Sequence, residues 1–215
     1  MSLFLGPIHQ WMFNKILILE SRAFSIATAL ESAGVERDAV NKAVADYGEK
    51  LAGRDLADML GDNSIHQFLY GLIAKVQIFE ASLVDLAKNS FDIVLKAVEA
   101  HGRETADNAV KAVGVKTASL EDIYRLIHDN QLEGMPCDPG AETAPLNPGK
   151  LGYFHSTCNH IQNWEYTSVD IKRMCALTNA WIKGFIAGVN GNASYEVKET
   201  IAGGAQSCKA EITVS

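Results

Sequence analysis

The stretch VDIKRMCALTNAWIKGFIAGV, residues 169–189, decides the fold, because it predicts a long helix with strands expected on both sides of it. Its apolar side chains recur at helical spacing, and Thr167 or Ser168 can cap its start. The expected strands, of which the last two are joined by a glycine turn, are residues 150–157, 195–201 and 209–214. The last third of the chain is therefore expected to form a small antiparallel sheet with this helix packed on it.

Ahead of this region the sequence predicts only helices. Apolar residues recur with a period near that of a helix, and glycine or polar residues separate the periodic segments. Ser119 and Asp122 form a looser capping box at the start of the last of them. The predicted helices cover residues 8–33, 37–59, 64–86, 90–101, 105–113 and 119–133. The fold class is therefore α+β, with a helical N-terminal half followed by the sheet.

The two halves are joined by the stretch GMPCDPGAETAPLNPGK, residues 134–150. It holds four prolines and three glycines, which predicts one long loop without regular structure. A loop of this length is either a functional lid or a disordered connector. We expect a single domain over residues 1–215, made of a helical part (1–133), this loop, and a strand-helix-hairpin part (151–215) that binds a ligand.

Composition and charge exclude several classes of function. The 215 residues are 47% hydrophobic and carry a formal net charge of −7, which argues against a nucleic-acid partner because such binding depends on clustered Lys and Arg. The first residues lack the basic region and cleavage site of a secretion signal, and no apolar run is long enough for a membrane span. We expect a cytoplasmic protein with reduced thiols and no membrane partner.

The cysteines are concentrated where the fold changes character. All four lie in the last 80 residues, whereas the first 135 contain none, so we expect the chemistry in the C-terminal part. Cys158 follows the predicted strand and is expected to start a short helix, whose dipole would favour the thiolate. It is the candidate nucleophile, and His155 or His160 is the candidate acid/base. The alternative is a buried thiol beside two ordinary histidines.

The other thiols allow two interpretations. Cys175 lies on the apolar stripe of the helix, and strand alternation places Cys208 on the inner face of the last strand, so both can belong to the core. The alternative is a zinc or iron site made by Cys158, Cys175, Cys208 and His160. No Cys-x-x-Cys or His-x-x-x-His pair supports a metal directly.

Aromatic residues of the same region are candidates for ligand binding. Tyr153, Trp164 and Trp181 could line a pocket for a flat small molecule, although core positions are the alternative. Cys137, in the proline-rich segment, could reach a ligand if that segment moves, or it is a surface thiol. The remaining histidines have no acid or thiol nearby in sequence that would promote them above surface or capping roles, which we therefore expect for His9, His66, His101 and His128.

The N-terminal segment FLGPIHQWMF, residues 4–13, is unusually apolar for the end of a chain. An exposed arm of this kind would pack on a neighbouring copy or on the sheet of its own chain. We therefore expect a homodimer.

Residues 150–215 resemble the family of L-2-amino-thiazoline-4-carboxylic acid hydrolases. The resemblance is carried by Ser156-Thr157-Cys158, by Cys175, and by the hairpin motif Thr200-Ile-Ala-x-Gly204-x-x-x-Cys208. Asn159 stands where the family usually has Pro, and Thr178 where it tends to carry Asp. The helix NAWIKGFIAG (179–188) and the hairpin after it also resemble 4-vinyl-reductase-type small-molecule-binding domains.

These resemblances imply a 4-vinyl-reductase-like fold, in which a ligand pocket lies between the helix that carries Cys175 and the sheet. The first implies a bacterial hydrolase that opens a small sulfur- and nitrogen-bearing ring at its amidine-like carbon. The resemblance to 4-vinyl-reductase-type domains implies a binding or sensor module without catalysis, in which Cys and His side chains could hold a metal. The missing acid after Cys175 favours the second.

Overall fold

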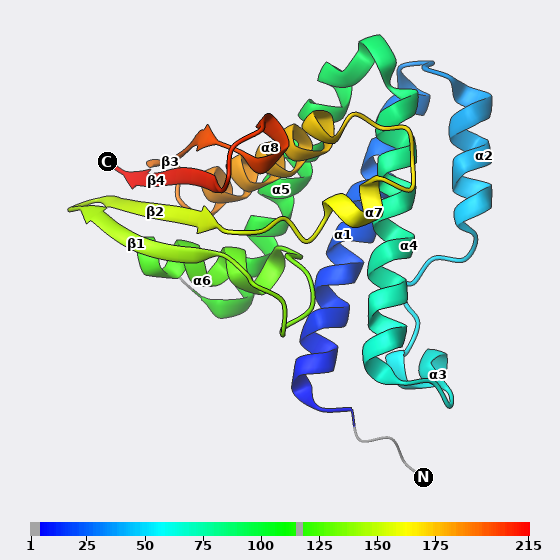
Figure 1. The fold of residues 1–215 in the computed structure, drawn as a ribbon, viewed down its shortest axis with the longest axis horizontal. Helices are drawn as coiled ribbons and strands as arrows, with labels where there is room; N and C mark the ends of the chain where they lie inside the picture. The colour runs from blue at the N-terminus through cyan, green and yellow to red at the C-terminus, as the bar shows by residue number, and fades with distance from the viewer. Residues whose placement is uncertain (1–4, 115–117) are drawn as a thin grey trace.

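The computed structural model describes residues 5–114 and 118–215 and confirms the α+β class (Figure 1). Helices dominate the N-terminal half, and a four-stranded sheet follows. The helices are α1 (Pro7–Ser32), α2 (Arg37–Tyr47), α3 (Leu56–Leu60), α4 (Ile65–Leu86), α5 (Phe91–Val113), α6 (Leu120–Asn130), α7 (Ile161–Trp164) and α8 (Ile171–Val189). The strands are β1 (Glu142–Asn147), β2 (Lys150–His155), β3 (Ala193–Glu199) and β4 (Cys208–Val214).

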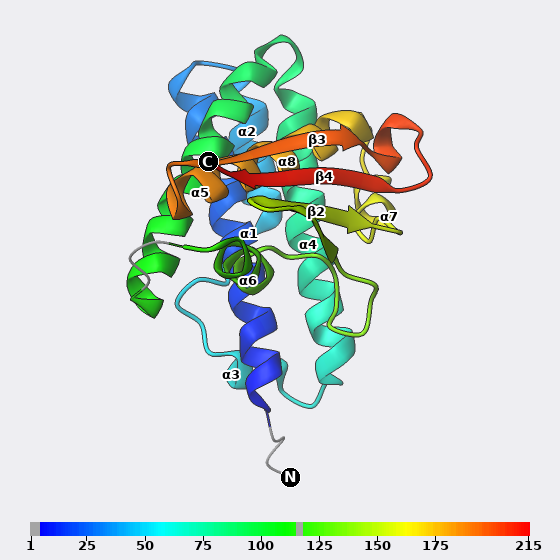
Figure 2. The same ribbon diagram turned by 90° about the vertical axis from the view of Figure 1, so that its left-hand side faces the viewer.

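The sheet is antiparallel throughout, with the strand order β1-β2-β4-β3. The expected terminal hairpin is the pair β3 and β4, with a short 3-10 helix, η2 (Ile201–Gly203), in its connection. The chain passes from β2 through α7 and α8 before β4 returns to pair with β2. This pairing sets His155 opposite Cys208 at one end of the sheet. Figure 2 shows the sheet in front of the helices, with α8 behind it.

Two helices, α5 and α8, approach each other so closely that only glycine fits between them. A Cβ atom on Gly184 would lie 2.1 Å from the Glu99 carbonyl oxygen, and one on Gly102 would lie 2.4 Å from the Trp181 carbonyl oxygen. Gly188 meets Ala106 in the same way, one turn farther along α8. The glycines let the two backbones touch, and this contact places α8 at the sheet.

The helix predicted over residues 37–59 is two helices with a loop between them. Gly48, with φ +80°, ends α2, and the chain then turns back onto α1. The buried carboxylate of Glu20 on α1 holds this loop, because it accepts the Tyr47 hydroxyl and the Leu51 amide at 2.6 Å each and the Ala52 amide at 3.0 Å. A carboxylate that binds two backbone amides is a tertiary contact, which helical periodicity does not encode.

Two helix boundaries in the middle of the chain also differ from the prediction. The helices expected over 90–101 and 105–113 form one continuous helix, α5, because Gly102 packs against α8 and does not end the helix. The capping box at Ser119 is confirmed, but the helix it starts ends at Asn130.

Farther along the chain, the proline-rich segment contains β1, contrary to the expected loop over residues 134–150. Pro145 is tolerated there because β1 is an edge strand, which uses backbone groups on one side only. The cap of α8 is Asp170 and neither Thr167 nor Ser168, because the Asp170 carboxylate accepts the Lys172 amide at 2.9 Å.

The apolar N-terminal segment is not a free arm. From Pro7 it is helical, and Met12 and Phe13 are buried in the core of their own chain. Phe4 lies outside the described residues. None of the helices in the described part of the chain combines the length and the apolar character needed to cross a membrane.

The glycine contact between α5 and α8 can be tested by adding one methyl group. We expect Gly184→Ala to lower the free energy of unfolding by about 3 kcal/mol, because overpacking at backbone outweighs the better helix propensity of Ala. Gly71→Ala in α4 is the matched control, since nothing lies within 4 Å of a Cβ there. It should be neutral or stabilising by up to about 1 kcal/mol in urea denaturation. Equal effects of the two substitutions would contradict the close contact.

Candidate functional site

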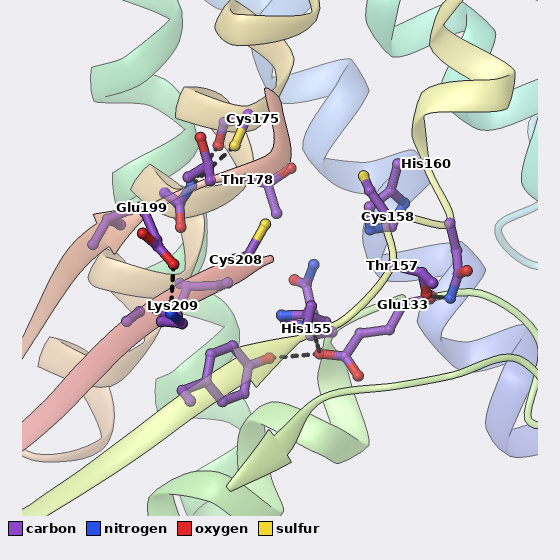
Figure 3. Close-up of a pocket in the computed structure, with 18 of the residues that line it drawn as sticks. Glu133, His155, Thr157, Cys158, His160, Cys175, Thr178, Glu199, Cys208 and Lys209 are labelled. Carbon is purple, nitrogen blue, oxygen red and sulfur yellow. Dashed lines mark hydrogen bonds and ion pairs between the residues drawn. The ribbon is translucent and has the colours of Figure 1, made fainter. Parts of the chain in front are cut away.

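A half-open pocket lies between α8, the inner face of the sheet and the segment that leads into α7 (Figure 3). Its empty space, counting the open mouth, is about 660 Å³. The walls are mostly apolar, with polar groups at a few points, as is usual for small-molecule sites. Candidate functional side chains on its walls include Glu133, Tyr153, His155, Cys158, His160, Trp164, Cys175, Asn179, Tyr195, Glu199, Cys208 and Lys209.

One wall carries a carboxylate that holds two neighbouring side chains. Oε1 of Glu133 accepts the Tyr153 hydroxyl at 2.5 Å and faces Nε2 of His155 at 3.1 Å, while Oε2 accepts the Ala141 amide at 3.1 Å. Burial disfavours the charged form of Glu133, but the bonds from His155, Tyr153 and Ala141 outweigh it and lower its pKa to about 2. Glu133 is therefore ionised at neutral pH.

Strand geometry explains why Tyr153 and His155 both reach this carboxylate. They are two residues apart on β2, so their side chains point to the same inner face of the sheet. Glu133 comes from the segment that joins α6 to β1. Because Nε2 of His155 donates a hydrogen bond to the Glu133 carboxylate, Nδ1 is the nitrogen of the neutral ring that can accept a proton. This is the arrangement in which a carboxylate orients an imidazole base.

His160, which directly precedes α7, has a different environment. Gln77 donates to its Nδ1 at 2.7 Å, and its ring stacks on Trp164 with centroids 5.2 Å apart. Burial lowers the pKa of His160 to about 4, with the charge of Arg22 acting in the same direction and Glu133 acting against it. His160 is thus neutral at neutral pH, and it serves better as a hydrogen-bond donor than as a base.

Three thiols line the pocket without a disulfide. Burial raises the pKa of Cys175, and it also raises the pKa of Cys208. The Cys175 sulfur lies 3.4 Å from the Asn179 amide, and the Cys208 sulfur accepts the Ile201 amide at 3.3 Å. Both are therefore neutral thiols held by their neighbours.

Cys158 lies on the pocket wall, but its predicted place at a helix start is wrong. Strand β2 ends at His155 and α7 begins at Ile161, so Cys158 sits in the connection between them. No hydrogen bond joins its sulfur to His155 or His160 in the described part of the chain. The dipole argument for a thiolate at Cys158 therefore does not apply.

Most of the sequence-predicted site residues converge on this pocket, and two do not. Tyr153, His155, Cys158, His160, Trp164, Cys175 and Cys208 all line it. Trp181 is 1% exposed and packs in the core, where its indole donates to His101 at 3.0 Å. Cys137 is exposed, and it does not line the pocket.

Two polar residues of the site, Glu133 and Asn179, were not predicted from the sequence. Glu133 lies 22 residues before His155 and in a segment assigned to a helix, so no local pattern joined them. Asn179 donates to the Cys175 carbonyl oxygen at 2.8 Å and accepts the Tyr195 hydroxyl at 2.8 Å. Its position four residues after Cys175 on a helix was the signal available, since such residues share a face.

The predicted metal ligands do not gather into a metal site. Within residues 5–114 and 118–215, no group of three or more His, Cys, Asp or Glu side chains is arranged to hold a metal ion. Cys158 and His160 line the pocket from the connection between β2 and α7, Cys175 lines it from α8, and Cys208 lines it from β4. A zinc or iron site through these residues finds no support in this geometry.

Comparison with known proteins found no match to this chain. No family model, no curated protein and no solved structure matches it. The resemblance to the hydrolase family rests on Ser156-Thr157-Cys158, Cys175 and the hairpin motif alone.

His101, for which we expected a surface or capping position, is buried where α5 packs against α1 and α8. Its Nδ1 accepts the Trp181 indole, and its Nε2 lies 3.2 Å from the Ser21 hydroxyl. Burial lowers the pKa of His101 from 6.5 to about 4, and the charge of Arg22 acts in the same direction. The buried partners explain why a surface position was wrong.

This environment predicts a loss of stability in mild acid. As the pH falls below 6.5, the unfolded chain takes up protons that folded His101 and His160 refuse until about pH 4. We expect the free energy of unfolding to fall in this window by up to about 3 kcal/mol for each histidine. His101→Gln should flatten the profile measured by urea denaturation, and His66→Gln, on an exposed residue, should not. A profile unchanged by His101→Gln would contradict the buried neutral imidazole.

Proposed function

We propose that this protein hydrolyses a small ring compound that carries nitrogen and sulfur, using a water molecule activated by His155. The contact between Glu133 and His155 on the pocket wall carries the proposal. An ionised carboxylate that orients an imidazole is the recurring device for general acid/base catalysis. The pocket around it supplies aromatic and thiol surfaces that suit a flat, polarisable ring.

The reaction can be written with the groups present. Nδ1 of His155 accepts a proton from water while the water oxygen bonds to the amidine-like carbon of the ring. The negative charge of Glu133 stabilises the imidazolium that forms. The imidazolium then returns the proton to the ring nitrogen or sulfur as its bond to that carbon breaks, and the ring opens with the net addition of one water.

Tyr153 and His160 support this chemistry without changing their own charge. Burial, and the neighbouring Glu133, raise the pKa of Tyr153 well above its ordinary value, so its hydroxyl keeps its proton and holds Oε1 of Glu133 in place. Neutral His160 can donate a hydrogen bond to the ligand or to the negative charge that develops on it.

A binding module without catalysis is the second candidate. It is favoured by the absence of an acid after Cys175, because Thr178 stands where the family tends to carry Asp, and the next residue, Asn179, presents an amide paired with Cys175 and Tyr195. Both candidate functions use the same pocket, but only the hydrolase converts the bound compound.

Removal of either member of the Glu133–His155 pair tests the hydrolase. We expect Glu133→Gln and His155→Asn each to lower kcat/KM at least about a hundredfold for ring opening of a panel of thiazolines and imidazolines, followed by chromatography. Glu142→Gln, on an exposed carboxylate of β1, is the matched control and should retain full activity. Ligand binding by calorimetry with no turnover by the unaltered protein would instead establish the binding module.

The role of Cys158 is tested separately. Because no hydrogen bond joins its sulfur to His155 or His160 among the described residues, we expect Cys158→Ala to stay within about tenfold of the unaltered protein in kcat/KM. A loss of a thousandfold or more, together with a covalent adduct on Cys158 detected by mass spectrometry, would make the thiol the nucleophile and would exclude direct attack by water.

A further inference from the structure

Asn159, a pocket residue to which the proposed reaction assigns no role, joins two segments of the chain. It lies in the connection between β2 and α7, and its side-chain amide donates to the Glu133 carbonyl oxygen at 2.7 Å and to the Pro139 carbonyl oxygen at 2.9 Å. A primary amide has two N–H groups, so Asn159 has one for each carbonyl. It therefore closes residues 133–139 into a loop, and one end of that loop is the residue whose carboxylate orients His155.

The loop is also held by contacts within it. Oδ2 of Asp138 accepts the Met135 amide at 2.8 Å, and the Asp138 amide donates to the Met135 carbonyl oxygen at 2.9 Å. Gly134 has φ +123°, and a Cβ atom on it would lie 2.8 Å from Asp138 Oδ2 and 2.9 Å from the Asn159 amide nitrogen. The glycine backbone thus packs against the Asn159 amide, and a larger residue would push the loop away from it.

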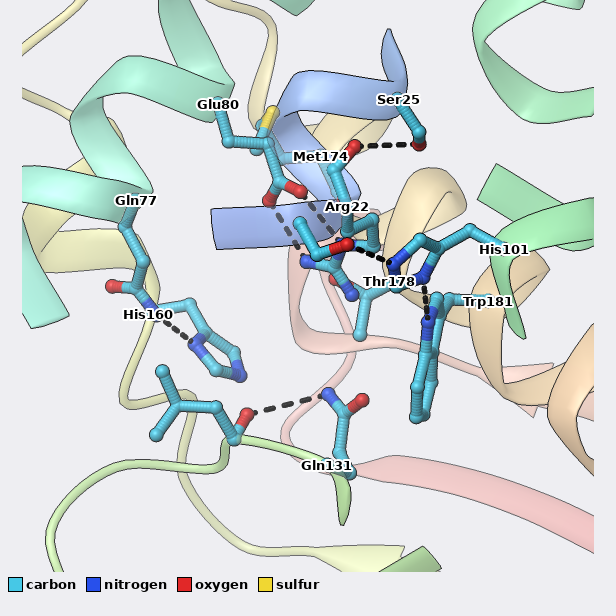
Figure 4. A network of polar contacts seen from close by, with 12 residues as sticks. Arg22, Ser25, Gln77, Glu80, His101, Gln131, His160, Met174, Thr178 and Trp181 are labelled. Carbon is cyan, nitrogen blue, oxygen red and sulfur yellow. Dashed lines mark hydrogen bonds and ion pairs between the residues drawn. The ribbon is translucent and has the colours of Figure 1, made fainter. Parts of the chain in front are cut away.

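On its other side, Asn159 is anchored to the helical half of the chain. Figure 4 shows the next residue, His160, bonded to Gln77 of α4, whose amide group lies 2.7 Å from Nδ1 of the ring. The carbonyl oxygen of Gln77 accepts the Asn163 amide at 2.6 Å, and both of these amide residues are buried. Because the connection that carries Asn159 is attached to α4 at residues 160 and 163, it forms a fixed base for the loop.

The carboxylate contacts of Glu133 depend on where its backbone lies. Its Oε1 meets Tyr153 and His155 on β2, and its Oε2 accepts the Ala141 amide at 3.1 Å. These bonds have their observed lengths only while the Glu133 backbone stays at a set distance from β2. A displacement of about 1 Å in a catalytic arrangement can lower a rate by about a hundredfold.

We propose that Asn159 is a positioning residue, which holds the Glu133 backbone so that the carboxylate orients His155. Both N–H groups of Asn159 have backbone acceptors, so it acts through Glu133 and not on the reacting atoms. Its effect on the rate rests on the hydrolysis proposed above. Its effect on the contact between Glu133 and His155 can be measured without a substrate.

The hydrogen bond between His155 and Glu133 gives the substrate-free measurement. An imidazole N–H bound to a carboxylate exchanges slowly with water, and its signal in ¹H–¹⁵N spectra of the full chain is assigned by its loss in His155→Asn. We expect a protected Nε2–H signal of His155 in the unaltered protein. It should broaden or disappear in Asn159→Ala, which removes both donors without adding a charge. The absence of the signal from the unaltered protein, or an unchanged signal in Asn159→Ala, would overturn the proposal.

Steady-state kinetics test the same residue with any compound that the unaltered protein turns over. Asn159→Ala should lower kcat by a factor of about 10 to 100 and change KM less than about threefold, because the walls that contact the ligand remain. A kcat that stays unchanged in this variant would overturn the role of Asn159 in the reaction. If the unaltered protein turns over none of the compounds, the proposed hydrolysis fails, and the His155 signal alone decides whether Asn159 positions Glu133.

Two further variants separate positioning from a general loss of stability. Asn63→Ala is the matched control, because the Asn63 amide also donates to a backbone carbonyl, that of Leu60 at 2.8 Å, and Asn63 does not line the pocket. It should leave the His155 signal and kcat unchanged. If urea denaturation shows that Asn159→Ala does not fold, Asn159→Ser serves instead. Its single hydroxyl can serve one carbonyl at most, so a smaller loss in the same direction is expected, and no loss would contradict the proposal.

Discussion

The close contact between α5 and α8 is the constraint on which the rest of the structure depends. Gly102 and Gly184 remove the side chains that would hold the two helices apart, so each backbone packs directly on the other. The opposite side of α8 then lies at the sheet, and Cys175 and Asn179 from that side become one wall of the pocket. A helix displaced by the width of a methyl group would narrow or close the space between α8 and β3.

Buried polar contacts link this framework to the site. Arg22 and Glu80 join α1 to α4, and Gln77, one turn from Glu80 on α4, holds His160 at the pocket. Breaking such a pair would leave a buried charge without its partner, a cost of several kcal/mol, so the pair fixes the relative position of the helices. Through Gln77, the helical half determines the tautomer of a pocket residue. The cysteine-free part of the chain is therefore more than a support for the sheet.

The candidate site could be predicted from the sequence where neighbours in the chain are neighbours in space. Strand alternation placed Cys208 on the inner face of the last strand, and Tyr153 and His155, two residues apart on β2, share one face by the same rule. Glu133 escaped prediction because its partners lie on β2, 20 and 22 residues later. For Trp181 the core position, which the sequence left open as the alternative, is the one observed, since a helical aromatic residue faces the pocket or the core according to which helix packs beside it.

By itself, the sequence determined most of the helical segments and three of the four strands, since the period of apolar residues reports the face that each segment must bury. It determined the α+β order and the terminal hairpin in the same way. Only the tertiary structure decided that the proline-rich segment contributes an edge strand, that residues 91–113 form one helix, and that Glu133 meets His155. Those outcomes depend on contacts between segments distant in the chain, whose energy appears only when the segments pack together.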